Sequence, residues 1–203
     1  MAVCTNSSLQ CSISIAEEKI VNAYLKSRQT WLLAQLNEVK MFDQLFESIK
    51  GHTLVDKDRC FMIYQLMRHA SCIPGDVAEV GVYKGGTAKL IAKSCGSHSV
   101  FLFDTFEGML EADSKKDLHK AGDFADTSEE KVKQFLGDCP NAKTIKGFFP
   151  ETGEDYENRK FCFVYIDVDI YKSIRDCCEF FYPRMNVGGI IRVAGCLHGP
   201  HGM

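Results

Sequence analysis

The sequence predicts an α/β fold in which a doubly wound parallel sheet is covered by helices on both faces. Three observations indicate this. Beyond residue 76, short apolar segments alternate with segments of helical periodicity. The apolar segments are nearly continuous hydrophobic runs, which is typical of strands buried on both faces. The 203 residues, 45% of them hydrophobic, are enough for one domain with a sizeable core. With right-handed crossovers, this pattern describes a Rossmann-like domain.

The composition narrows the class of protein. The formal charge is −3, and no Lys/Arg-rich stripe offers a phosphate backbone a binding surface, so we expect no nucleic-acid partner. No apolar run approaches the roughly 20 residues that span a bilayer, and the first residues lack the regions of a secretory signal. The ten cysteines show neither a disulfide framework nor metal-ligand spacing. We therefore expect reduced thiols, a cytoplasmic location and no membrane partner.

The first part of the chain is predicted to be helical. Apolar residues recur at steps of three or four from about residue 17 to 49, and a second helix is expected over 56–71. The turn residues at 73–76 then end the helical pattern. We expect residues 1–55 to be an N-terminal helical extension that caps the site or forms a dimer face, and residues 56–203 to be the Rossmann-like domain.

The remaining elements are mostly strands that alternate with helices. The predicted strands are residues 77–82, 99–103, 143–149, 161–166 and 188–193, and the predicted helices between them are residues 85–95, 128–136 and 171–182. Ligands of doubly wound sheets bind beyond the carboxyl ends of the strands. Polar residues that follow these strands are therefore the candidates for a functional site.

The first such cluster is the stretch AEVGVYKGGT at residues 78–87. Gly81 ends a strand and Gly85 opens a helix, so a ligand could approach the backbone closely, beside the exposed N–H groups of a helix start. The spacing G-x-x-x-G-G differs from the dinucleotide pattern, which disfavours a nicotinamide cofactor. Glu79, within the strand, suits an amine or hydroxyl donor, such as the cationic amine of a methionine-derived cofactor. The alternative is a tight strand-to-helix turn.

Two further clusters carry aspartates. Asp104 ends the second strand 23 residues after Gly81, a separation typical of an acidic residue that binds ribose hydroxyls, although it could instead cap a helix. In the third cluster, Asp123 could meet an adenine amino group. Either Asp126 or Thr127 is predicted to cap the following helix, and Thr127 is favoured because Glu130 completes a capping box.

The fourth cluster is Asp167-Val168-Asp169, which follows a buried strand. Two nearby carboxylates are costly unless a cation or a proton is shared between them. The pair therefore indicates metal binding or acid–base catalysis. The alternative is one helix cap and one solvated aspartate.

Read together, five ordered motifs resemble the macrocin O-methyltransferase family of S-adenosylmethionine-dependent enzymes. The motifs are GDVAEVGVYKGGTAKLIA, FLFDTFEGM, GDFADTS, GFFPET and YIDVDIYKSIRDCCEFFYPRMNVGGII, within residues 75–191. The resemblance implies a class I methyltransferase fold and transfer to a hydroxyl of a small-molecule acceptor, such as a sugar or natural product. The residues it implies around S-adenosylmethionine are Glu79, Gly81, Gly85, Thr87, Asp104, Phe106 and, near the adenine, Asp123.

The resemblance also implies assistance by a divalent ion such as Mg²⁺, with Asp167 as a metal ligand and Asp169 as the catalytic base. In the family, a pair of adjacent aspartates follows the fifth strand, whereas this chain has Ala194 and Gly195 there. We therefore expect metal dependence to be weak or missing. The alternative function is a catalytically impaired methyltransferase-like protein that binds the cofactor or a protein partner.

The predicted sheet is also shortened at its C-terminal end. Class I methyltransferases have seven strands, and this sequence has room for about five. The fifth strand is therefore predicted to form an exposed edge, and such edges invite pairing with another chain. A homodimer or a partner chain at this edge is expected.

Overall fold

The computed structural model describes residues 15–108 and 124–194. The chain divides into two compact units, Met1–Asp43 and Gln44–Met203. Helix α1, Ile15–Ile49, begins in the first unit, and all other helices and strands belong to the second. The role expected for residues 1–55, a cap or a dimer face, stays a prediction. Among the described helices, none combines the length and the apolar character needed to cross a membrane.

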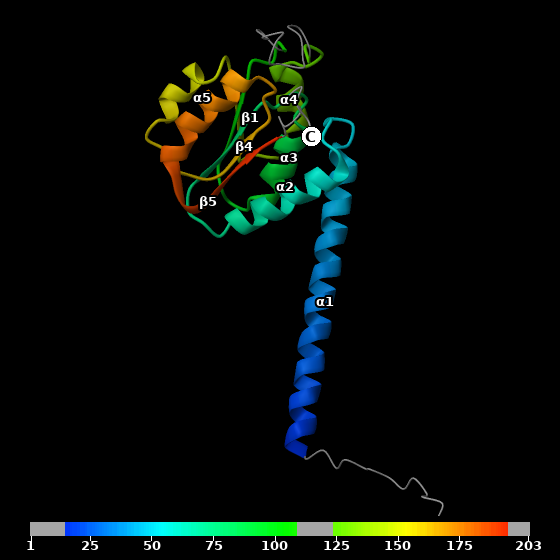
Figure 1. The fold of residues 1–203 in the computed structure, drawn as a ribbon. Helices are drawn as coiled ribbons and strands as arrows, with labels where there is room; N and C mark the ends of the chain where they lie inside the picture. Colours follow the sequence, from blue (N-terminus) through cyan, green and yellow to red (C-terminus); the bar gives the residue numbers. More distant parts are fainter. Residues whose placement is uncertain (1–14, 109–123, 195–203) are drawn as a thin grey trace, which may run out of the picture. The chain divides into compact units, whose positions relative to one another are not determined.

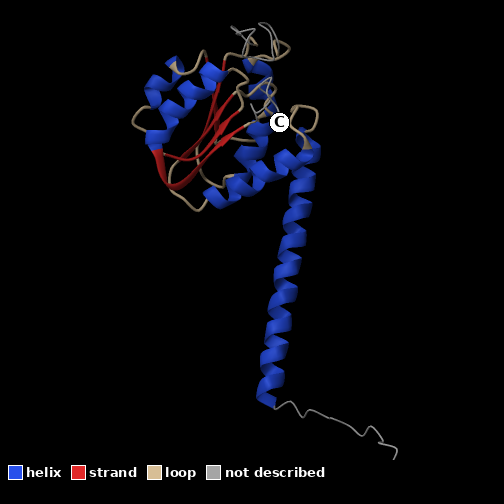
Figure 2. Cartoon of the chain, in the orientation of Figure 1, coloured by secondary structure: helices blue, strands red, loops and turns tan. Residues whose placement is uncertain are grey.

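Five parallel strands form one sheet in the second unit, in the order β3-β2-β1-β4-β5 (Figures 1 and 2). The strands are β1 Asp76–Val80, β2 Val100–Asp104, β3 Ala142–Lys146, β4 Phe161–Ile166 and β5 Met185–Val193. The chain moves outward from β1 to β3 and then returns to lie beside β1 with β4. The order therefore reverses between β1 and β4, which is where ligands of doubly wound sheets bind. The predicted fold class is confirmed.

Helices cover both faces of this sheet. The helices are α2 Lys57–Ala70, α3 Gly86–Ser94, α4 Glu129–Phe135 and α5 Tyr171–Phe181, with short 3₁₀ helices at Glu151–Tyr156 and Tyr182–Arg184. Helix α2 contacts β4, β5 and α3, whereas α5 contacts β4 from the opposite side (Figure 1). Each strand of the central part is thus buried from above and below, which explains its continuous apolar sequence.

The face beneath α5 holds an aromatic core. The ring of Phe103 contacts the rings of Phe149, Tyr156 and Phe181 at centroid separations of 5.3, 5.3 and 6.3 Å, all in T-shaped arrangements. Edge-to-face pairs of this kind stabilise a core beyond the burial of their area. Tyr156 comes from the 3₁₀ helix Glu151–Tyr156, which the sequence did not predict, because a single buried aromatic in a polar segment gives no periodic signal.

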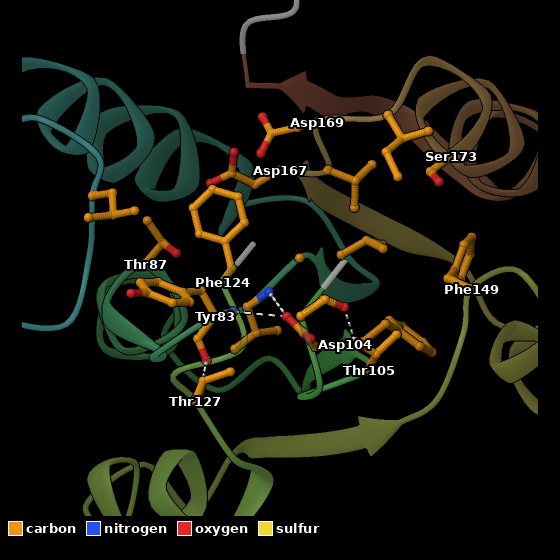
Figure 3. Close-up of a pocket in the computed structure, with 18 of the residues that line it drawn as sticks. Tyr83, Thr87, Asp104, Thr105, Phe124, Thr127, Phe149, Asp167, Asp169 and Ser173 are labelled. Carbon is orange, nitrogen blue, oxygen red and sulfur yellow. Dashed lines mark hydrogen bonds between the residues drawn. The ribbon is translucent and has the colours of Figure 1, made fainter. Parts of the chain in front are cut away.

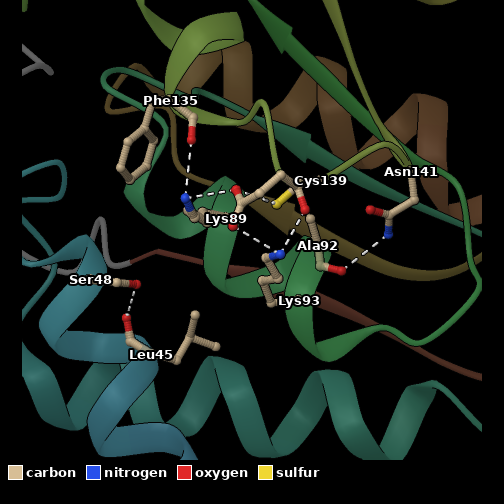
Figure 4. Close-up of polar contacts among 9 residues, drawn as sticks. Leu45, Ser48, Lys89, Ala92, Lys93, Phe135, Cys139 and Asn141 are labelled. Atoms are coloured by element: carbon tan, nitrogen blue, oxygen red, sulfur yellow. Dashed lines mark hydrogen bonds and ion pairs between the residues drawn. The ribbon is translucent and has the colours of Figure 1, made fainter.

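Helix α4 is fixed to α3 by lysines (Figure 4). Lys89 Nζ donates to the carbonyl oxygen of Phe135 at 3.1 Å and pairs with Asp138 at 2.8 Å, and Lys93 pairs with the same carboxylate at 3.0 Å. The two ammonium groups hold the pKa of Asp138 well below its usual range. Asn141 adds hydrogen bonds from its side chain to the carbonyl oxygens of Ala92 and His98.

The predicted cap of α4 is wrong by one residue. The side chain of Ser128, and not that of Thr127, accepts a hydrogen bond from the backbone N–H of Lys131, at 3.3 Å. Thr127 instead donates to the carbonyl oxygen of Tyr83, at 2.6 Å. The helix begins at Glu129, so the capping position is residue 128, and the hydroxyl before it is free to join α4 to the turn after β1.

Candidate ligand-binding site

A cavity of about 440 Å³ opens where β1, β2 and β4 end (Figure 3). Its volume is in the range of small-molecule sites. Five residues predicted from the sequence line it: Gly81, Thr87, Asp104, Asp167 and Asp169. The tertiary structure therefore brings the first, second and fourth predicted clusters to one crevice. Asp123, predicted to lie near an adenine, is outside the described residues.

Asp104 organises the floor of this cavity. One carboxylate oxygen accepts hydrogen bonds from the backbone N–H groups of Val82 and Tyr83, at 2.6 and 2.9 Å. The other accepts from the N–H of Phe106, at 2.7 Å. Hydrogen bonds to a carboxylate are about twice as strong as those between neutral groups. Asp104 therefore ties the turn after β1 to the end of β2. Phe106 is itself buried. It donates its backbone N–H to Asp104 but does not line the cavity.

Glycines are required where the turn after β1 passes other backbone. Gly81 has φ +89°, and a Cβ there would lie 2.2 Å from the carbonyl oxygen of Asp167. Gly85 has φ +84° and precedes α3, and a Cβ would lie 3.1 Å from a methyl group of Val132. Gly86, the second glycine of the pair predicted to open the helix, donates its N–H to the carbonyl oxygen of His52 at 3.0 Å. It lets the loop between α1 and α2 reach the cavity.

Glu79 lies behind the cavity wall. Its side chain is fully buried, and one carboxyl oxygen accepts a hydrogen bond from the Thr87 hydroxyl at 2.5 Å. Its second oxygen is buried with no hydrogen-bond partner among the described residues. Burial raises the pKa of Glu79 well above its ordinary range, and the bond from Thr87 opposes that shift. Thr87, and not Glu79, lines the cavity, so Glu79 acts on the site through Thr87.

Asp167 and Asp169 lie together on the wall formed by the end of β4 (Figure 3). The Tyr165 hydroxyl donates to Asp167 at 3.1 Å. The pKa of Asp167 is raised to about 6, chiefly by burial and also by the charge of Asp169, against the opposing effects of the bond from Tyr165 and the charges of Arg59 and Arg192. Asp167 is thus a partly buried carboxylate held by the protein, beside a second carboxylate on the same wall.

The residues that the structure describes at this cavity do not fit the divalent ion that the family resemblance implies. Such ions take six or more oxygen ligands, and a protein site usually supplies several carboxylates. Within residues 15–108 and 124–194, no group of three His, Cys, Asp or Glu residues could hold a metal ion. The described residues that end β5 are Arg192, Val193 and Ala194, which supply no carboxylate. Asp167 has Tyr165 as its partner instead.

Several cavity residues were missed by the sequence analysis. Tyr83 and Phe124 line the cavity with their rings in edge contact at 5.6 Å. Both have positive φ, as does Phe106, and these are the three non-glycine residues of the described chain in that region. Strained backbone of this kind clusters at ligand sites. The G-x-x-x-G-G spacing marked the turn that holds Tyr83, but no pattern in the sequence indicated its conformation.

Comparison with known proteins agrees with this architecture. The family model described as Macrocin-O-methyltransferase (TylF) matches residues 24–198. Demethyldecarbamoylnovobiocin O-methyltransferase of Streptomyces niveus is 26% identical, over 70% of this chain and 62% of its own length. A tetracenomycin-C 4'-O-methyltransferase of Streptomyces olivaceus, whose acceptor carries a dimethoxy-rhamnosyl group, is also 26% identical, over 60% and 53% of the two chains. The chain therefore spans about six tenths or less of the length of these relatives.

The fold has solved counterparts as well. The structure of the O-methyltransferase NovP has a TM-score of 0.69 to this chain at 21% identity, covering 80% of this chain and 86% of that one. At this sequence identity the similarity concerns the fold alone. The shared fold is the class I methyltransferase arrangement expected from the sequence.

Substitution of Gly81 should disrupt the site. For Gly81→Ala we expect a loss of more than about 3 kcal/mol in the free energy of unfolding, because the Cβ would collide with the Asp167 carbonyl. The matched control is Gly96→Ala, where φ is +69° but no atom lies within 4 Å of the added Cβ. It should lose only about 1–2 kcal/mol from backbone strain. Urea denaturation measures both, and equal losses would contradict the close approach.

The stability of the protein should depend on pH through Asp167. Because burial raises its pKa to about 6, the folded state binds the proton more tightly than the unfolded state does. The protonated form is favourable at low pH, and that contribution is lost as the pH rises to about 6. Asp167→Asn should therefore be more stable than the wild type at pH 7.5, by about 3 kcal/mol, and about equally stable near pH 4. Urea denaturation at both pH values checks this, and a constant difference would contradict it.

Proposed function

The chain belongs to the macrocin O-methyltransferase family, and on this basis we propose that it is an S-adenosylmethionine-dependent O-methyltransferase. Its acceptor is proposed to be a small molecule with a free hydroxyl group, such as a sugar or another natural product. One observation carries the proposal. The ends of β1, β2 and β4 meet at a single cavity, where Gly81, Asp104 and Asp167 lie together.

The residues of this cavity suit a cofactor that bears a nucleoside. An ionised carboxylate can accept about four hydrogen bonds, and the carboxylate of Asp104 accepts three of them from backbone N–H groups. One position remains for a ribose hydroxyl. Thr87 and the close turn at Gly81 and Gly85 are proposed to face the amino-acid end of the cofactor, with Glu79 supporting Thr87. Phe106 supports Asp104, and the role of Asp123 near the adenine stays a proposal.

Asp169 is proposed to be the base. When bound, S-adenosylmethionine supplies a methyl group on a positively charged sulfur. The acceptor oxygen forms its bond to the methyl carbon as the carbon–sulfur bond breaks, and Asp169 takes the proton that the hydroxyl loses. Asp169 lines the cavity three residues beyond the end of β4. Its place on the cavity wall supports this role.

The acceptor end of the cavity is proposed to lie between the loop after α1 and the start of α5. Leu54, Val55 and Ile170 offer apolar surface there, and His52 and Ser173 offer polar groups. The ring of His52 stacks on Phe135 of α4 at 3.8 Å, which fixes that loop. Apolar walls with a few placed polar groups are typical of sites for small organic ligands. A sugar with an apolar aglycone fits this chemistry.

The cysteines support the proposed cytoplasmic location. The seven described cysteines are all free thiols, and five of them are buried. Free buried thiols in this number are typical of a reducing compartment.

We also propose that a second copy of this chain pairs along β5. In the described part of the chain, β5 pairs on one side alone, with β4. Val187 on this strand is 100% exposed, and Tyr182, in the 3₁₀ helix that precedes the strand, is 77% exposed. An unpaired edge with apolar side chains is a template for another strand. Sedimentation equilibrium should give the mass of a dimer, and Val187→Glu should shift it to the monomer. A monomeric wild type would contradict this proposal.

Two carboxylate substitutions test the enzymatic proposal. Asp104→Asn should weaken S-adenosylmethionine binding at least about tenfold, because an amide places N–H groups opposite the backbone donors. Asp169→Asn should leave that affinity unchanged but reduce methyl transfer at least about a hundredfold. Calorimetry measures the binding, and a panel of hydroxylated sugars and phenols with labelled cofactor measures transfer.

The control is Asp155→Asn, an exposed aspartate on the 3₁₀ helix Glu151–Tyr156 that is not among the cavity-lining residues, and it should change neither quantity. Circular dichroism checks that each variant folds. Binding without transfer to any acceptor would favour the alternative of a cofactor-binding protein without catalysis. Absence of binding to the wild type would refute both.

A further inference from the structure

A row of polar side chains crosses three neighbouring strands behind the cavity. Glu79 of β1 is level with Tyr165 of β4, and Tyr165 is level with Arg192 of β5. Level residues on adjacent strands point to the same face of a sheet. Ile191 and Val193, on either side of Arg192, pack against the aromatic core beneath α5. Arg192 therefore points to the opposite face, the one that α2 covers.

The guanidinium of Arg192 is held inside this face. Its Nη1 donates to the carbonyl oxygen of Val193, and its Nε is buried with no hydrogen-bond partner among the described residues. The charge of Arg192 lowers the pKa of both Tyr165 and Asp167, so its field reaches the end of β4. A guanidinium that is even partly buried is costly unless negative charge lies nearby, and Asp167 supplies that charge.

The negative charge at the end of β4 is partly opposed by positive charges of the protein. Asp167 and Asp169 carry the negative charge, and the fields of Arg192 and of Arg59 oppose it at Asp167. Arg59 lines the cavity and also pairs with Asp56 at 3.3 Å. A divalent ion placed beside Asp167 would meet two carboxylates, too few for its usual ligand set, and would be repelled by the guanidinium behind them.

We propose that Arg192 supplies, from within the sheet, the positive charge that a divalent ion would otherwise provide at the end of β4, so that the site takes no metal ion. This inference rests on the proposed function, because the charge is proposed to assist methyl transfer. A positive charge at this place lowers the energy of the negative charge that develops on the acceptor oxygen as its proton leaves. Arg192 does not line the cavity and acts through Asp167, as a positioning residue.

Binding of Mn²⁺ to the whole chain is the first test. Electron paramagnetic resonance with and without S-adenosylmethionine should detect no bound ion at concentrations up to about 1 mM, the weak end of protein sites for divalent ions. Saturable binding of one ion in the micromolar range would overturn the proposal. The measurement needs neither acceptor nor turnover. If the transferase proposal is wrong, the protein will not bind the cofactor or will not transfer its methyl group. The Mn²⁺ titration can still be interpreted in that case.

A pair of variants tests Arg192 itself. The backbone N–H of Ala194 donates to the carbonyl oxygen of Ile166 at 2.8 Å, so Ala194→Asp would add a third carboxylate next to Asp167. With Arg192 in place, this single variant should still bind Mn²⁺ poorly. Combining it with Arg192→Val should tighten Mn²⁺ binding at least about tenfold, because a repelling charge is removed. Equal affinities, or no binding by the folded double variant, would overturn the proposal.

The conservative exchange gives an independent readout. Arg192→Lys keeps the positive charge and should retain kcat within about threefold, whereas Arg192→Gln should lower kcat at least about tenfold with the affinity for S-adenosylmethionine unchanged. Should the double variant not fold, Arg192→Gln also replaces it in the Mn²⁺ titration, with tighter binding than the wild type expected. Equal kcat for Gln and Lys, or added Mn²⁺ raising the wild-type rate, would contradict the inference.

Discussion

The site depends on one set of interactions: the Asp104 carboxylate accepts hydrogen bonds from three backbone N–H groups. These bonds reach back 22 and 21 residues to Val82 and Tyr83 and forward two residues to Phe106. They join the turn after β1 to the end of β2, and so they fix the gap into which the cavity opens. They also hold Tyr83 and Phe106, whose backbones have positive φ.

The two faces of the sheet have different tasks. The face under α5 is filled by aromatic rings and carries the packing energy of the domain. The face under α2 and α3 carries Glu79, Tyr165 and Arg192 in one row, with Thr87 and Asp167 connecting it to the cavity. The apolar face supplies rigidity, so the polar row can hold its charges in fixed positions at low dielectric, where they act most strongly.

Much of the site was predictable because its residues follow strands. Gly81, Asp104, Asp167 and Asp169 were found from their places at the ends of apolar runs, and all four line the cavity. The prediction for Thr127 was wrong, because capping depends on the first helical residue, and a shift of one position changes the partner. Tyr83 and His52 were missed, since their roles come from contacts between segments that are distant in the sequence.

The sequence by itself determined the alternation of strands and helices, because hydrophobic periodicity is a local property of the chain. It also placed carboxylates and glycines at the strand ends. Only the tertiary structure decided which strands are neighbours, and hence that Glu79, Tyr165 and Arg192 form one row, in which Tyr165 is the hydrogen-bond partner of Asp167. The physical reason is that register and burial arise from pairing between strands, and no single strand carries that information.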